Sequence, residues 1–135
     1  MKKLLLPLLI GLQLAASDTE LATRIYTTIA RALTAKSTPL FYVHGDIEEL
    51  RDNPAIRRTG NCFAADIIVA EHLEGLPAGC LDKPLFASRY RLFREHEEIV
   101  GAFFWQKGRP NIVFSAGRLQ QRGITLSAEF TPYIE

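Results

Sequence analysis

Apolar residues along the chain follow a helical spacing first and strand-like spacings afterwards. Between Asp18 and Ala35 they recur three and four positions apart, which is the spacing of one face of an amphipathic helix. Short apolar runs over residues 40–43, 66–70 and 84–88 each predict a strand. The uninterrupted, β-branched run at 66–70 is typical of a parallel strand that is covered on both faces. These elements predict an α/β fold.

The segments between and after these runs predict further elements. Asp46 stands in an N-cap position, with Glu49 three residues on, and predicts a helix with an apolar side at Ile47, Leu50 and Ile56. A second helix is expected over residues 90–96. The last third predicts a strand at 99–105, a turn at 107–110, a returning strand at 111–114 and a helix at 116–122 that Ser115 caps and Gly123 ends. We therefore expect a single small sandwich: a mixed, mostly parallel sheet flanked by helices, with a C-terminal β-hairpin and helix.

The first 17 residues have the three parts of a secretory signal. Lys2 and Lys3 are followed by a 13-residue, mostly apolar stretch from Leu4 to Ala16, and Ala15 to Ser17 offers small residues for cleavage. A membrane-spanning helix needs about 20 apolar residues, so we expect cleavage before Asp18 and no stable membrane insertion afterwards. The predicted organisation is a signal peptide at 1–17 and one α/β domain at 18–135, located in the periplasm.

The charge of the exported domain is close to neutral. The chain has 16 basic and 15 acidic residues, and the signal segment contains two of the basic ones and no acidic one. The domain at 18–135 therefore has 14 basic and 15 acidic residues. This balance argues against nucleic acid or anionic lipid as the main partner.

Cys62 and Cys80 are the only cysteines. Each lies four residues before a predicted strand, so parallel neighbouring strands would bring both to the same end of the sheet. Export would place them in a compartment where disulfides persist. We predict a structural disulfide; a metal pair or a redox-active pair are the alternatives, and no C-x-x-C motif or adjacent histidine favours them.

Polar residues follow the predicted strands where ligands bind in open α/β sheets. They are His44, Asp46, Glu71, His72, Ser88, Arg89 and Tyr90. Three interpretations remain open. They are ordinary loop polarity, a crevice for a small anion that uses Arg89 and the amides of the helix at Asp46, and a divalent-metal site of His44, His72 and Glu71. The candidate ligand-binding residues are thus His44, Glu71, His72 and Arg89. We expect no cofactor.

Motifs for catalysis are missing from the sequence. It contains no G-x-S-x-G, no H-E-x-x-H, no phosphate-binding glycine loop and no lone cysteine with a paired histidine. We therefore expect that the protein is not an enzyme. A hydrolase without a recognised motif is the less favoured alternative. Strand alternation places Phe103 and Trp105 on one face and Ala102 and Phe104 on the other. We expect both faces to be covered; an exposed Trp105 would be a natural partner-binding residue.

The end of the chain resembles the YfiR-like family of small periplasmic proteins. The resemblance rests on residues 111–114, on Arg118 and Leu119, and on residues 123–127, which follow the family's order of strand, helix, glycine and apolar-Ser. It implies a non-enzymatic regulatory protein that binds a membrane-bound sensor or signalling protein. This chain has one possible disulfide and a polar tail at 128–135, which depart from the family pattern, and no partner-binding residue carries over. The alternative function is a periplasmic protein that binds a small solute or a divalent metal in the crevice at the strand ends.

Overall fold

The computed structural model describes residues 2–135, with side chains from Asp18 onwards. The expected signal peptide therefore lies outside the residues whose side chains are described. Helix α1 spans Lys2–Thr34, and its part from Asp18 is the amphipathic helix that the apolar spacing predicts. Among the described residues, no helix combines the length and the apolar character that crossing a bilayer requires.

The core of the molecule is a five-stranded sheet in the order β1-β2-β3-β4-β5. Neighbours from β1 to β4 are parallel, and β5 runs antiparallel to β4. The strands are β1 Phe41–His44, β2 Ile67–Ala70, β3 Leu85–Ala87, β4 Gly101–Gln106 and β5 Arg109–Phe114. The predicted α/β fold with a mixed, mostly parallel sheet and a C-terminal hairpin is confirmed.

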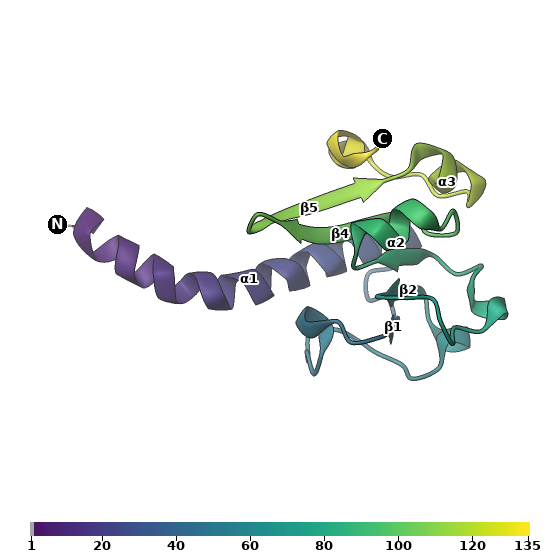
Figure 1. Ribbon diagram of the computed structural model, residues 1–135, viewed down its shortest axis with the longest axis horizontal. Coiled ribbons are helices and arrows are strands. Elements are labelled where there is room, and N and C mark those ends of the chain that lie inside the picture. Colours follow the sequence, from purple (N-terminus) through teal and green to yellow (C-terminus); the bar gives the residue numbers. More distant parts are fainter. Residues whose placement is uncertain (1) are drawn as a thin grey trace.

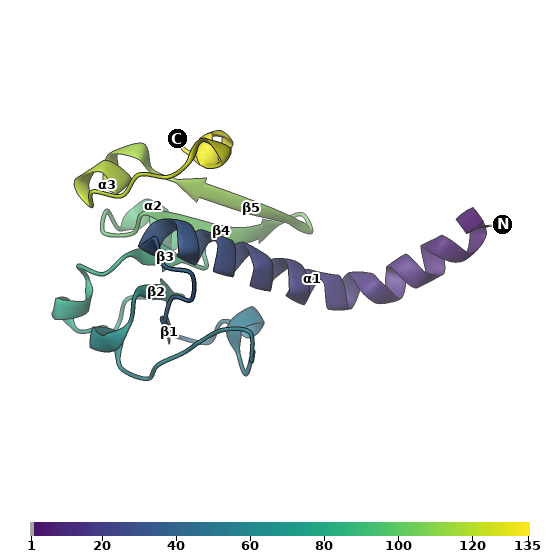
Figure 2. The same cartoon turned by 180° about the vertical axis from the view of Figure 1, so that it is seen from behind.

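Both faces of the sheet are covered, which explains the uninterrupted apolar strands. Helix α1 lies across one face, in front of the sheet in Figure 2, and α2 (Tyr90–Glu95) lies on the opposite side, in front in Figure 1. Under α1, the aromatic rings of Phe86 and Phe103 pack against Tyr26. On the other face, Phe93 of α2 joins Ile68, Leu85 and the two cysteines in a second cluster.

The alternation along β4 is as predicted. Phe103 and Trp105 belong to the cluster under α1, whereas Ala102 and Phe104 belong to the cluster on the opposite face. The hairpin turns through Lys107 and Gly108, which both have positive φ. Gly101 lies where β4, β5 and β3 pack closely, because a Cβ there would come within 2.5 Å of the Val113 carbonyl oxygen.

The expected helix at Asp46 is the main correction to the predicted elements. Only a single 3-10 turn forms, η1 at Glu48–Leu50, and its N-cap is Ile47 rather than Asp46. The helix stops here because Asp52 takes a positive φ of 50° and Pro54 disfavours helical geometry at the residue before it. The apolar side of the segment is nevertheless correct: Ile47, Leu50 and Ile56 are buried against the α1 layer.

The C-terminal part contains one element that the sequence analysis did not predict. Helix α3 spans Ala116–Gln121 and is capped as predicted by the Ser115 hydroxyl, which accepts a hydrogen bond from the Arg118 amide. After it, η4 (Ala128–Tyr133) buries Phe130, and the last residues return to the open edge of β5 through a parallel bridge at Ile134. The remaining 3-10 turns are η2 at Cys62–Ala64 and η3 at Ala78–Cys80.

Candidate functional site

The polar residues after β1 and β2 lie side by side, as the parallel register requires. His44, the last residue of β1, pairs with Ala70, the last residue of β2, and the Glu71 amide donates a hydrogen bond to the His44 carbonyl at 2.9 Å. The His72 ring consequently stands 4.9 Å from the His44 ring, centroid to centroid, at an interplanar angle of 66°. The structure thus brings together the two histidines that sequence reasoning singled out.

A glycine makes this close approach possible. Gly45 has a φ of 102°, and a Cβ on it would lie 2.8 Å from the Cβ of Glu71. A larger residue would be strained in its backbone and would push the loop after β1 away from the loop after β2. Gly45 therefore holds the two loops in contact.

The charged groups at this edge are already paired with one another. Glu71 accepts from the Arg89 guanidinium at 3.2 Å through Oε2 and from the Asp46 amide at 3.3 Å through Oε1. Asp46 in turn forms a two-oxygen contact with Arg51 at 2.7 Å. The anion crevice that the sequence suggested thus has its arginine engaged by a carboxylate, and the helix whose amides would complete it does not form.

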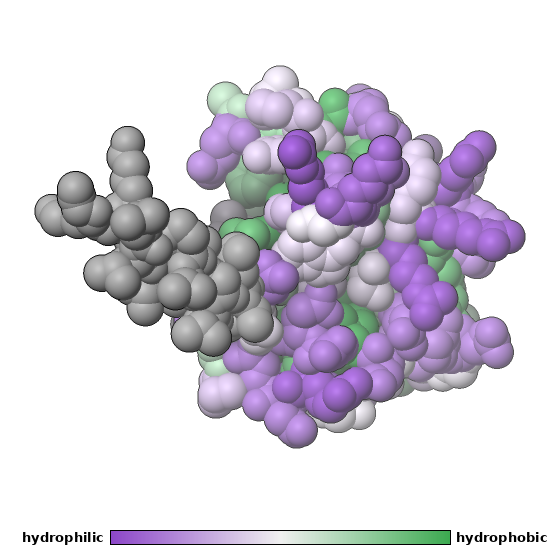
Figure 3. Space-filling model, turned by 60° about the vertical axis from the view of Figure 1, so that its left-hand side comes forward, coloured by the Kyte–Doolittle hydropathy of each residue, from purple (hydrophilic) through white to green (hydrophobic). Residues whose placement is uncertain are grey.

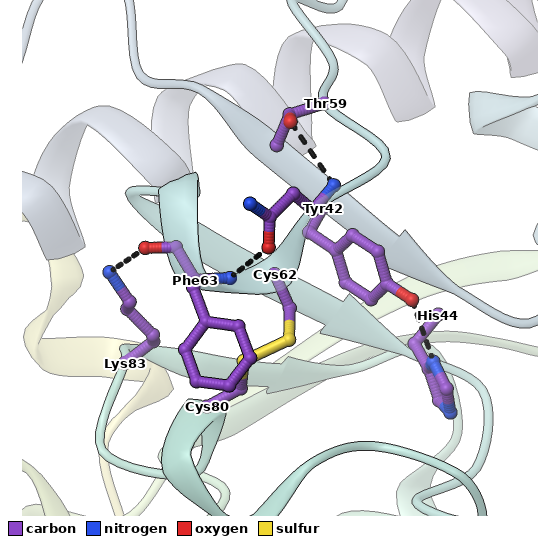
Figure 4. The surroundings of a disulfide bond; sticks show 8 residues. Tyr42, His44, Thr59, Cys62, Phe63, Cys80 and Lys83 are labelled. Atoms are coloured by element: carbon purple, nitrogen blue, oxygen red, sulfur yellow. Dashed lines mark hydrogen bonds between the residues drawn. A yellow bond between two sulfur atoms is a disulfide. The ribbon is translucent and has the colours of Figure 1, made fainter.

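His44 has hydrogen-bond partners at both ring nitrogens. Its Nε2 lies 2.6 Å from the Glu74 carbonyl oxygen, which can only accept, so this nitrogen carries the proton. Its Nδ1 lies 3.4 Å from the Tyr42 hydroxyl (Figure 4). No group of three His, Cys, Asp or Glu side chains in the part of the chain that the structure describes is arranged to hold a metal ion. A metal held by His44 together with His72 and Glu71 would have to coordinate the Nδ1 of His44, or the ring would have to leave the Glu74 carbonyl.

The predicted disulfide between Cys62 and Cys80 is confirmed. It links η2 to η3, with the two Cα atoms 6.0 Å apart, and both residues are buried. Phe63 lies over it with 56% of its surface exposed, and the Phe63 carbonyl accepts a hydrogen bond from Lys83 at 2.9 Å (Figure 4). The bond therefore fastens the connection between β1 and β2 to the connection between β2 and β3.

Trp105 is half-buried rather than free at the strand end. Its indole nitrogen donates to a carboxylate oxygen of Glu49 at 2.9 Å, and its ring lies 5.6 Å from that of Phe103. The large hydrophobic side chains that the described part of the structure exposes are Phe63, Tyr90 and Tyr133. Trp105 is thus connected to η1 and forms part of a surface that η1 shares with α1.

That surface is a groove which sequence reasoning missed. A recess of about 510 Å³ lies between α1, from Thr19 to Arg24, and the segment from Glu48 to Ala55. On the face shown in Figure 3 hydrophilic side chains dominate, and hydrophobic surface shows in the recesses between them. The walls come from two segments about 30 positions apart in the chain, so no local motif marks the groove; the run of acidic residues at 46–52 is the one signal the sequence offers.

The comparisons with known proteins show the fold and no function. No family model matches the sequence, and no curated protein matches it. Among solved structures, the chain is similar to the crystal structure of a conserved domain protein from Vibrio cholerae, with a TM-score of 0.54 and 8% sequence identity. The match covers 83% of this chain and 58% of the other, so the chain spans less than two thirds of that protein.

Proposed function

We propose that this chain is a non-enzymatic, exported binding protein of the periplasm that regulates a membrane-bound sensor or signalling protein. The observation that carries the proposal is the groove between α1 and the segment 48–55. The groove has a volume of about 510 Å³, and charged side chains line both of its walls. Such a recess on a small domain suits recognition of another protein.

The state of the polar residues supports binding rather than catalysis. A general base must be within hydrogen-bond reach of a substrate proton. His44 and Glu71 are instead used to join loops of this chain, through the Glu74 carbonyl and through Arg89. The residues that line the groove include no histidine and no cysteine.

The disulfide supports export. Disulfides form and persist in oxidising compartments such as the periplasm and are rare in the cytosol. The Cys62–Cys80 bond is therefore consistent with the secretory signal expected over residues 1–17.

Crosslinking in cells tests the proposal. Cells that express the full chain with a tag after Glu135 are treated with a membrane-impermeant crosslinker, and adducts from solubilised membranes are identified by mass spectrometry. We expect enrichment of an integral membrane protein with a domain on the periplasmic side, relative to an unrelated exported protein of similar size. Recovery of the tagged protein with no enriched membrane protein would contradict the proposal.

A second candidate function is the binding of a small solute or a divalent metal by the polar cluster at the strand ends. The approach of His44 and His72 to 4.9 Å favours it. Protein purified without chelator and dialysed against Zn²⁺ should then retain about one equivalent of metal. The variant His72→Ala should retain none, and retention equal in both proteins would exclude this site.

A further inference from the structure

The groove described above continues into a second hollow. The first recess is lined by Thr19, Glu48 and Glu49 among others, and these three residues also line an adjoining hollow of about 450 Å³ that reaches Trp105 and Gly108. The two recesses therefore form one surface, which we call the acidic groove. Each recess falls within the roughly 300–1,000 Å³ of ordinary ligand sites. A single side chain or a small ion would fill only part of the whole.

Charge is concentrated on this surface. The domain at 18–135 has 15 acidic and 14 basic residues, and the acidic groove takes five of the acidic residues but two of the basic ones. The acidic residues are Asp18, Glu20, Glu48, Glu49 and Asp52, and the basic ones are Arg24 and Arg51. Arg51 is neutralised by Asp46, which it contacts through both carboxylate oxygens. The groove is thus strongly negative on a nearly neutral domain.

An aromatic side chain next to Glu49 adds a feature that suits a cationic ligand. Trp105 is held by its hydrogen bond to Glu49 at the edge of the groove, and an indole face attracts ammonium and guanidinium groups.

We propose that the acidic groove binds a segment of the partner protein that carries lysine or arginine side chains. The carboxylates on both walls attract the cationic groups, and Trp105 offers its ring to one of them. That the partner is a protein rests on the proposed function. That the bound segment is cationic rests on the charge of the groove itself.

A peptide titration tests the chemistry. The probe is a hexa-arginine peptide, with hexa-citrulline as its uncharged counterpart. Trp105 is the only tryptophan of the chain, so its fluorescence and its indole N–H resonance report on the groove alone. We expect a saturable change with the arginine peptide and none with the citrulline peptide. A Trp105 signal that does not change with hexa-arginine would overturn the proposal.

Charge variants separate specific binding from general attraction. The pair Glu48→Gln with Asp52→Asn removes two groove charges, and asparagine tolerates the positive φ at position 52. The matched pair Asp82→Asn with Glu97→Gln removes two exposed charges elsewhere. We expect about a tenfold weaker Kd for the groove pair, which is about 1.4 kcal/mol, and a change below twofold for the control pair. Equal weakening by both pairs would show only general charge attraction and would overturn the proposal.

A change of opposite sign strengthens the test. Arg24 is exposed on the wall of the groove, so Arg24→Gln should tighten binding of the hexa-arginine peptide. If the groove pair does not fold, Glu20→Gln on the exposed side of α1 replaces it and should weaken binding. Tightening and weakening by charge of the expected sign cannot follow from loss of structure. An Arg24→Gln variant that binds less tightly would contradict the proposal.

Repeating the membrane crosslinking with the groove pair distinguishes the two proposals. If the membrane partner is captured equally by the groove pair and the unchanged chain, the groove is not its binding surface, although the proposed function stands. If hexa-arginine binds as described but no membrane protein is captured, the groove stands and the proposed function fails.

Discussion

Removal of the disulfide should cost the protein a large part of its stability. The double variant Cys62→Ala with Cys80→Ala opens a link between residues 18 apart in sequence. In the chain-entropy model, closing a loop of this length stabilises the folded state by about 3 kcal/mol, because it restricts the unfolded chain. Domains of this size have about 5–15 kcal/mol in total, so the loss is substantial. The loss falls on two connections whose only regular elements are the short 3-10 turns η1, η2 and η3.

Urea unfolding monitored through Trp105 measures this loss. We expect the free energy of unfolding to fall by about 3 kcal/mol in the double variant. As a control, the same two proteins are unfolded in a strong reductant. There the unchanged chain also loses its disulfide once it unfolds, so the difference in free energy of unfolding between the two proteins should nearly vanish. A difference that persists undiminished in reductant would show that packing of the two buried side chains, and not the crosslink, stabilises the fold. Equal stability without reductant would refute the reasoning altogether.

Three further predictions concern other parts of the chain. The Asp66 carboxylate accepts from the Leu40 amide at 2.8 Å and from Lys36, and these bonds lower its pKa. Its stabilisation is therefore present above the unfolded-state pKa of about 3.9 and is lost as pH falls through the lower folded-state pKa. Asp66→Asn should cost about 1 kcal/mol at pH 7, and urea unfolding should show this difference shrinking in acid. Gly101→Ala should lower Tm, because the new Cβ would lie 2.5 Å from a backbone oxygen. Gly117→Ala in α3, where the new Cβ would have open space around it, should leave Tm unchanged or raise it. Equal effects of the two variants on Tm would contradict the close packing described at Gly101. N-terminal sequencing of the exported protein should begin at Asp18, and a first residue of Met1 would refute cleavage.

The sheet could be predicted from the sequence because its strands bury both faces. The runs at 40–43, 66–70 and 84–88 each contain little but apolar residues, so their extent alone locates β1, β2 and β3 to within about two residues. The segment after Asp46 could not be placed in the same way. Its apolar residues also fit a helix, and the positive φ of Asp52 together with Pro54 decides against one. The return of the tail to β5 uses backbone hydrogen bonds at Glu135, which leave no pattern in the side chains.

The candidate site was predictable in its location and not in its chemistry. Parallel strands bring His44 and His72 to one edge whatever the loops do, and the structure confirms this. The pairing of Glu71 with Arg89 depends on the path of two loops that meet at Gly45, and sequence spacing contains no information on that path. The acidic groove was out of reach for a similar reason, since its walls become neighbours only when α1 packs on the sheet.

Signal cleavage before Asp18 would create a titratable group at one end of the acidic groove, because Asp18 lines it beside Trp105. The new α-amino group has an ordinary pKa of about 7.7–8.0, and in its charged form it opposes a cationic ligand. An arginine peptide stays fully charged up to about pH 12. The charged groups that face the amino terminus across the hollow are the carboxylates of Glu48 and Glu49. Raising the pH from 6.5 to 9 should therefore tighten the Kd of the processed protein for hexa-arginine, by up to a few-fold at low salt, and acetylation of the amino terminus should abolish this dependence. A Kd for the processed protein that is the same at both pH values would place the cation away from Asp18, towards the recess between Glu20 and Asp52.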